Sequence, residues 1–304
     1  MKPAILVLQP LIPARMAELE AAYEVHQPDP GPEAEARIEA VVTDGHRGLS
    51  ADLIARLPRL SLVASGSAGL EGIDVGALRA RGIPLVNPAP ALADEVADLA
   101  MLLTLAAWKG LRAMDAHVRT GAWAREGDMA LGRSLRGRRM GMLGMGTIGR
   151  AIAARAEAFG LEVAYASRSP KDVPYPFEPD LLRLAGESDI LMVIVPGGPA
   201  TKGMVSAEVI AALGPGGVLV NVARGSVVDE PALIAALEEG RLGAAGLDVF
   251  WNEPRVDPRL ARLPNVVLAP HVGSATGETR DAMSRMVVEN LAAHFAGRPL
   301  LSPV

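Results

Sequence analysis

Short apolar runs alternate with longer mixed stretches along the first part of the chain. The runs with the length and β-branched content of strands are AILVL (4–8), EAVVTDG (39–45), SLVAS (61–65) and IPLVN (83–87). The stretches that mix alanine and leucine with charged residues, as helices do, are 14–23, 50–57 and 75–82. Strands that alternate with helices predict a parallel sheet covered on both faces.

The same alternation resumes near residue 138. The strand-like runs are 138–146, 161–167, 189–195, 217–223, 244–250 and 265–271. The helix-like stretches are 147–160, 206–214, 230–240 and 278–297. The pattern therefore predicts an α/β fold with two doubly wound parallel-sheet lobes.

Two segments of a different character separate the two series. Residues 93–117 have a helical pattern of unusual length in which Gly110 is the weak position, and such a helix could bridge two lobes. Residues 119–139 are polar, contain several glycines and show no clear period. We expect this second segment to be a long surface excursion that can act as a partner-binding arm.

Composition restricts the function classes. The chain has 304 residues, 50% of them hydrophobic, a net charge of −5 and no cysteine. The balance gives no support for a nucleic-acid surface, and the lack of cysteine excludes disulfides and thiolate chemistry. The longest apolar stretch, 97–108, is shorter than the ~20 residues that span a bilayer. We expect a soluble cytoplasmic protein without a metal site.

One turn has the spacing of a dinucleotide-binding motif. GMGTIG places Gly144, Gly146 and Gly149 after an apolar strand and at the start of an alanine-rich helix. In such motifs the first glycine allows the tight turn, the second lets the backbone approach a pyrophosphate, and the third lets helix and strand pack closely. The helix N-terminus offers free N–H groups to the anion. This context predicts dinucleotide binding.

The residues after the second strand of this lobe indicate which dinucleotide. An NAD-binding lobe carries an acid about 20 residues after the turn, where it accepts from the ribose 2′-hydroxyl. This chain has Ser167, Arg168 and Ser169 there, with Lys171 nearby. A guanidinium attracts a 2′-phosphate that a carboxylate would repel. We therefore expect NADP(H) as the preferred cofactor, with NAD(H) as the alternative.

Three charged or titratable residues follow later strands of the same lobe. They are Arg224 in NVARGSVVDE, Glu253 in GLDVFWNEP and His271 in LAPHVGSAT. The carboxyl ends of parallel strands face the ligand crevice, so the three side chains are expected to converge. Arg224 can hold a substrate carboxylate, His271 can donate a proton to a carbonyl oxygen, and Glu253 can fix the imidazole tautomer.

Together these motifs resemble the D-isomer-specific 2-hydroxyacid dehydrogenases. The resemblance rests on GMGTIG, NVARGSVVDEPALIAAL, GLDVFWNEP and LAPHVGSAT, and extends to DEVADLAMLL and SGSAGLEGID, which together cover nearly the whole chain. It implies that Arg224, Glu253 and His271 are the substrate-binding arginine, the modulating acid and the proton donor. The resemblance also implies that Ser67, Ala68 and Gly69 offer backbone N–H groups to the substrate carboxylate.

The resemblance implies further details of the cofactor site and the domains. The expected cofactor-binding residues are Gly144, Met145, Gly146, Thr147, Ile148, Gly149, Ser167, Arg168, Ser169, Val195, Pro196, Val222, Ala223, Asp248, His271 and Gly273. Asp248 matches a position near the nicotinamide carboxamide. The substrate-binding domain is expected at 1–96 and 276–304, with the cofactor-binding Rossmann domain, 97–275, inserted into it.

Within the family, the stretch YASRSP and the length of the chain look most like NADPH-dependent glyoxylate/hydroxypyruvate reductases, which act on small 2-oxo acids. The excursion at 119–139 resembles the arm through which such enzymes form homodimers. Trp251 departs from the family pattern, which often has a smaller or acidic residue there. It either shapes the mouth of the pocket or serves packing.

Two alternatives stay open at this point. One is NAD-linked oxidation of a D-2-hydroxy acid, which a comparison of the two cofactors would separate from the reductase hypothesis. The other is a dinucleotide-sensing binding protein, like the transcriptional corepressors that share the fold. Turnover of a 2-oxo acid would distinguish an enzyme from such a sensor.

Overall fold

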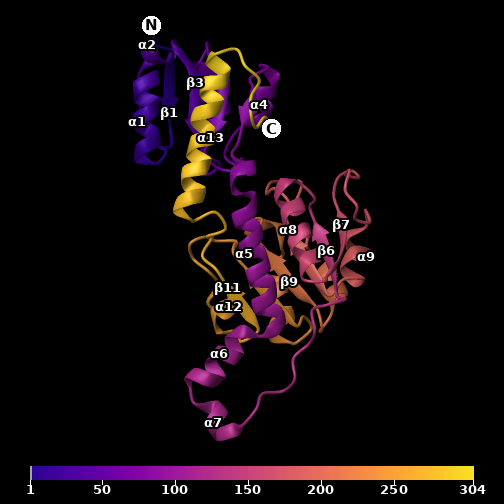
Figure 1. Cartoon of the computed structure of the whole chain (residues 1–304). Coiled ribbons are helices and arrows are strands. Elements are labelled where there is room, and N and C mark those ends of the chain that lie inside the picture. Colours follow the sequence, from indigo (N-terminus) through magenta and orange to yellow (C-terminus); the bar gives the residue numbers. More distant parts are fainter. Residues whose placement is uncertain (1) are drawn as a thin grey trace. The chain divides into compact units, whose positions relative to one another are not determined.

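The structure is a computed structural model that describes residues 2–304 and divides into two compact units (Figure 1). The first unit comprises Met1–Ala93 and Ser274–Val304, and the second comprises Asp94–Gly273. The second unit is thus inserted into the sequence of the first. The expected roles of the two units, substrate binding and cofactor binding, stay predictions.

The first unit contains a five-stranded parallel sheet in the order β2-β1-β3-β4-β5. Its strands are β1 (Ala4–Val7), β2 (Glu24–His26), β3 (Ile38–Thr43), β4 (Leu62–Ser65) and β5 (Leu85–Val86). Its helices are α1 (Pro13–Ala22), α2 (Pro32–Glu35), α3 (Ala51–Arg56), α4 (Val75–Ala80) and α13 (Gly277–Phe295). Helices α1 and α13 contact each other, although one lies near the start of the sequence and the other near its end (Figure 1).

Both faces of this sheet are covered. Alternate residues of β1 enter two separate cores, Ala4 and Leu6 on one face and Ile5 and Val7 on the other. Side chains of successive strand residues point to opposite faces, so a strand buried on both sides reads as a continuous apolar run. Strand β2 lies at the edge and is only partly buried, which explains why its three residues carry no such signal.

The second unit contains a six-stranded parallel sheet in the order β11-β10-β9-β8-β6-β7. Its strands are β6 (Arg139–Leu143), β7 (Glu162–Ala166), β8 (Ile190–Val193), β9 (Val218–Asn221), β10 (Ala244–Leu247) and β11 (Val266–Leu268). Its α-helices are α6 (Leu111–Arg119), α7 (Ala122–Glu126), α8 (Thr147–Ala158), α9 (Leu181–Gly186), α10 (Ala207–Leu213), α11 (Glu230–Glu238) and α12 (Pro258–Arg262). Helix α5 (Ala89–Lys109) begins in the first unit and continues through the second.

The long helix expected over 93–117 is two helices. Gly110 adopts a left-handed conformation with φ of 70° and separates α5 from α6. Glycine takes this conformation without the steric penalty of a Cβ, so the weak position of the pattern becomes the break. The following excursion is not wholly irregular, because it contains the short helix α7.

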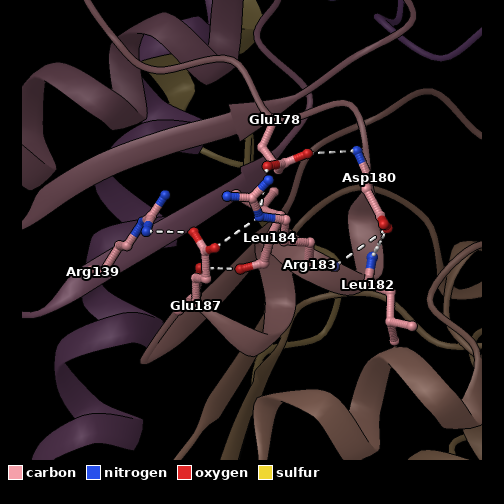
Figure 2. Close-up of polar contacts among 8 residues, drawn as sticks. Arg139, Glu178, Asp180, Leu182, Arg183, Leu184 and Glu187 are labelled. Carbon is pink, nitrogen blue, oxygen red and sulfur yellow. Dashed lines mark hydrogen bonds and ion pairs between the residues drawn. The ribbon is translucent and has the colours of Figure 1, made fainter.

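Helix α9 was not expected from the sequence, and polar contacts bind both of its ends (Figure 2). The Asp180 carboxylate caps the helix by accepting from the N–H groups of Leu182 and Arg183. Glu187 at the other end bonds Arg183 at 2.9 Å and Arg139 of β6 at 2.8 Å. These two cations, Arg183 first, lower the pKa of Glu187. The helix is therefore tied to the first strand of the sheet.

Because all six strands are parallel, the loops after them lie at one edge of the second unit's sheet. The glycine turn follows β6, the Ser167–Ser169 stretch follows β7, and Arg224 follows β9. Glu253 and His271 follow β10 and β11. The fold therefore brings the candidate residues of this unit to a single edge.

Candidate active site

In the glycine turn, steric contacts exclude a side chain at both outer glycines, Gly144 and Gly149, each for a different reason. Gly144 has φ of 112°, and a Cβ there would lie 2.5 Å from the Ile194 carbonyl oxygen. A Cβ at Gly149 would lie 2.7 Å from the Gly144 carbonyl oxygen. The first glycine thus permits the turn, and the third permits α8 to pack against it.

Gly146 is different, because a Cβ there would meet no described protein atom within 4 Å. It is the N-cap of α8, and no side chain caps the helix there. A helix N-terminus that keeps its backbone donors and has space in front of them is suited to a phosphate group. The residues of this turn therefore fit the pyrophosphate of a dinucleotide.

The segment Ser167–Ser169 forms a tight turn beyond β7. Ser167 Oγ donates to the carbonyl of Ser169 at 2.6 Å. The hydroxyl of Tyr165, a fully buried side chain, accepts from the Lys171 N–H at 2.7 Å and donates to the Lys171 carbonyl at 3.2 Å. Tyr165 thus fixes the base of the loop, and Arg168 is exposed at its tip.

The remaining predicted cofactor contacts follow the central strands. Val195 and Pro196 follow β8, and Val222 and Ala223 follow β9 and are buried. They lie on the same edge of the sheet as the glycine turn, since β8 pairs with both β6 and β9. Their contact with a cofactor stays a prediction.

Arg224 is positioned by the residue that ends β9. The side chain of Asn221, 1% exposed, accepts from the Ala223 N–H and donates to the Arg224 carbonyl, both at 3.0 Å. These two bonds fold the chain into a turn directly after the strand. The Arg224 guanidinium donates to the Ala223 carbonyl at 2.6 Å and is partly exposed.

Glu253 and His271 are brought together by the structure. The Glu253 Oε2 atom lies 2.6 Å from His271 Nδ1, and its Oε1 atom accepts from the Phe250 N–H at 2.9 Å. A carboxylate only accepts, so Nδ1 carries the proton and Nε2 is the ring nitrogen left for chemistry. The imidazole is about half exposed, with 48% of its side chain accessible.

The loop that carries His271 is held by Asp248. His271 has a positive φ of 55°, which is uncommon for a residue other than glycine. The Asp248 carbonyl accepts from the His271 N–H, and its carboxylate accepts from the N–H groups of Val272 and Gly273 at 2.8 and 3.0 Å. Burial raises the pKa of Asp248, whereas these two N–H groups act to lower it. Asp248 therefore stabilises the conformation of the histidine.

In the first unit, Ser67, Ala68 and Gly69 form a compact loop after β4. The Ser67 hydroxyl accepts from the Gly45 N–H and donates to the Gly69 carbonyl, both at 2.8 Å. The Ser67 N–H donates to Ser65 Oγ at 3.2 Å. The N–H of Ser67 is therefore engaged within the loop, which leaves those of Ala68 and Gly69 as the better candidates for a carboxylate.

Sequence reasoning missed the residues that hold the candidate groups in place. Asn221, Tyr165 and Glu230 bond main-chain atoms of the loops that bear the predicted residues. The signal that could have found Asn221 and Tyr165 is a polar side chain inside an otherwise apolar strand. Trp251 also bonds the chain after Arg224, since its indole N–H donates to the Val228 carbonyl at 2.7 Å.

Residues 2–304 contain no cluster of three or more His, Cys, Asp or Glu side chains that could hold a metal ion. None of the helices in the same range combines the length and apolar character needed to cross a bilayer.

Comparisons with known proteins agree with the family resemblance. The model for the NAD-binding domain of D-isomer specific 2-hydroxyacid dehydrogenases matches residues 101–273. A hydroxyphenylpyruvate reductase from Plectranthus scutellarioides is 49% identical over 268 residues, which make up 88% of this chain and 85% of that protein. A 2-ketogluconate reductase from Gluconobacter oxydans (strain 621H) is 41% identical over 310 residues, which cover 100% of this chain and 99% of the relative.

A solved structure gives the same result. The crystal structure of an NADPH-dependent glyoxylate/hydroxypyruvate reductase from Sinorhizobium meliloti, in complex with NADP and malonate, has a TM-score of 0.88 and 41% identity to this chain. The match covers 100% of this chain and 97% of that one. The predicted fold class is thereby confirmed. The chain belongs to the D-isomer specific 2-hydroxyacid dehydrogenase family and is an oxidoreductase.

Proposed function

We propose that this chain reduces small 2-oxo acids, such as glyoxylate or hydroxypyruvate, to D-2-hydroxy acids with NADPH. The observation that carries the proposal is the 2.6 Å pairing of His271 Nδ1 with Glu253 Oε2 at the sheet edge that also bears the glycine turn. A carboxylate-held imidazole is suited to proton transfer. Relatives named as reductases of hydroxyphenylpyruvate, glyoxylate/hydroxypyruvate and 2-ketogluconate support this substrate class.

The proton donor in this proposal is His271. A nicotinamide dinucleotide held at the glycine turn would supply the hydride for the carbonyl carbon of the substrate. Nδ1–H of His271 is held by Glu253, so the imidazolium delivers its proton from Nε2 to the carbonyl oxygen. Glu253 stabilises the positive ring before transfer and keeps its orientation afterwards.

Arg224 is proposed to bind the carboxylate of the 2-oxo acid. A guanidinium can bond a carboxylate through two parallel N–H donors, which fixes orientation as well as position. Asn221 holds the backbone on either side of this arginine and limits its movement. In the first unit, proposed as the substrate-binding domain, the N–H groups of Ala68 and Gly69 are offered as further donors to the substrate.

The preference for NADPH rests on Arg168. The guanidinium lies at the tip of a turn whose base is fixed by Tyr165, with the hydroxyls of Ser167 and Ser169 beside it in sequence. A 2′-phosphate would add a charge-assisted bond there that a 2′-hydroxyl cannot. The NADP complex of the Sinorhizobium meliloti relative supports this cofactor for the family branch.

The direct test is a substrate and cofactor panel. Purified protein is mixed with glyoxylate, hydroxypyruvate, hydroxyphenylpyruvate or 2-ketogluconate, and oxidation of NADPH and of NADH is followed at equal concentrations. We expect turnover with at least one of these acids, a higher kcat/KM with NADPH, and a product of D configuration. NADPH binding without turnover of any acid would favour a dinucleotide sensor, and a preference for NADH would favour NAD-linked chemistry.

We also propose a homodimer formed through the segment after α5. Apolar side chains are exposed along it, and Leu131 is completely accessible while Trp123 and Val118 are 58% and 60% exposed. A monomer rarely exposes such a group of large apolar residues together. Light scattering of the wild type and of Leu131→Asp tests this, with a dimer expected for the first and a shift toward monomer for the second.

A further inference from the structure

The loop that follows Arg224 lies in direct main-chain contact with the loop that carries Glu253. A Cβ placed on Gly225 would lie 2.0 Å from the carbonyl carbon of Phe250 and 2.1 Å from its oxygen. No side chain fits between the two backbones at this point. Neither loop can therefore move closer to the other at this point.

Two hydrogen bonds cross the same junction. The Glu230 carboxylate, at the first turn of α11, accepts from the Trp251 N–H at 3.0 Å. The Trp251 indole N–H donates back to the Val228 carbonyl at 2.7 Å. Trp251 is 44% exposed, so its indole is held in place by this hydrogen bond more than by packing. Glu230, in contrast, is buried, with 9% of its surface exposed.

The junction acts on the atoms that hold the histidine. Two successive N–H groups of one turn are each bound by a carboxylate, Phe250 by Glu253 and Trp251 by Glu230. The first of these bonds fixes Oε1 of Glu253, and the second Glu253 oxygen contacts His271. The bond between Glu230 and the Trp251 N–H holds this turn in place. It thereby also holds the Glu253 carboxylate in the orientation in which Oε2 contacts His271.

We propose that Glu230 and Trp251 are positioning residues that keep Glu253 hydrogen-bonded to His271. The inference rests on the proposed function. It gives a structural role to Trp251, the residue at which this chain departs from the family pattern. Neither residue is proposed to touch the substrate. Replacing either residue makes the turn at Phe250 and Trp251 more mobile, and the hydrogen bond between Glu253 and His271 is then formed in a smaller fraction of the molecules.

The first test uses a pair of substitutions at one position. Glu230→Ala removes the acceptor and is expected to lower kcat about ten- to a hundredfold, since a misplacement of about 1 Å costs about 10²-fold. Glu230→Gln keeps an acceptor oxygen for the Trp251 N–H and is expected to restore kcat to within about threefold of the wild type. KM for the 2-oxo acid changes less, because Asn221 holds Arg224 independently.

The matched control is Glu208→Ala. Glu208 is also an acid in the first turn of a helix of the second unit, but it bonds Ser206, outside the candidate site. We expect unchanged kcat for this variant. If Glu230→Ala also retains kcat, or if Glu230→Gln fails to restore it, the positioning role is wrong.

The second test does not depend on turnover. The Nδ1–H proton of His271, bound at 2.6 Å to a carboxylate, should give a downfield proton resonance that Glu253→Gln abolishes. We expect Glu230→Ala to weaken or remove the resonance, Trp251→Phe to weaken it, and Glu208→Ala to leave it intact. A wild-type protein with the resonance but no reductase activity would contradict the proposed function alone. A resonance that survives Glu230→Ala and Trp251→Phe would contradict the positioning role alone.

Discussion

Replacing Gly225 by alanine tests whether the contact between the two site loops matters for catalysis. The residue directly follows Arg224 and lies at the junction described above, and its φ is not in the left-handed region, so the expected effect is purely steric. The nearest atoms to the new methyl group would be backbone atoms of Phe250 and Trp251. Backbone atoms cannot rotate away as the end of a flexible side chain does.

The magnitude follows from these distances. The new Cβ would start 2.0 Å from a carbonyl carbon, and real Cβ contacts stay above 3.0 Å, so the loops must separate by about 1 Å. Overpacking of this kind costs about 1–3 kcal/mol. For a unit of this size that corresponds to a fall in Tm of roughly 2–12 °C. A separation of about 1 Å between Arg224 and Glu253 is expected to reduce kcat/KM by about 10²-fold.

Steady-state kinetics with NADPH and a 2-oxo acid measure the change in kcat/KM, and thermal unfolding measures the change in Tm. Gly186→Ala is the matched control, because a Cβ at that exposed position in α9 would meet no described atom within 4 Å. We expect the control to behave like the wild type. If Gly225→Ala keeps kcat/KM within about twofold and melts with the wild type, the two loops tolerate separation and our reasoning about the junction fails.

Four further predictions concern other parts of the molecule. Gly146→Ala should weaken binding of both NADPH and NADH without lowering Tm, since its Cβ meets no protein atom within 4 Å; a lower Tm with intact binding would contradict this. Arg168→Ala should raise the KM for NADPH at least about tenfold and leave that for NADH unchanged, measured by initial rates. Asp248→Asn replaces one acceptor by a donor facing a backbone N–H, so kcat should fall at least about tenfold with the fold retained by circular dichroism. Burial lowers the pKa of His294 below its ordinary 6.5, so its neutral form contributes stability above pH 6.5 that is lost as pH falls; His294→Gln should reduce the fall of Tm on acidification.

The elements that were predictable from the sequence are those with a continuous apolar signal. Strands such as β6 and β8 are buried on both faces, and their runs of methionine, leucine and valine identify them directly. The partly buried edge strand β2 and the short helix α9 have no such run. Helix α9 packs Leu184 and Ala185 into the core, and Glu187 at its end pairs with Arg139, 48 positions away in sequence. Single-sequence periodicity does not contain this long-range information.

A similar division applies to the candidate site. Arg224, Glu253 and His271 stand at strand ends in long motifs, so their residue types and positions were sufficient to single them out. The residues that orient them were not predictable in this way. Asn221 and Glu230 bond main-chain atoms, and any residue can supply a main-chain N–H or carbonyl. A polar residue in an apolar strand can therefore mark Asn221 as unusual, but the sequence does not show which loop it holds.

Whether a residue is exposed or bonded to the backbone also decides how directly the effect of its substitution can be interpreted. Arg168 is exposed and forms no hydrogen bond or ion pair with the described residues 2–304, so its removal leaves no buried partner without a bond. A change in cofactor preference in Arg168→Ala would then report on the cofactor itself. Glu230 is buried and bound to the backbone, so its removal leaves an unsatisfied N–H group as well as a freed turn. For that reason the glutamine variant, which restores only the acceptor, is the informative member of the Glu230 pair.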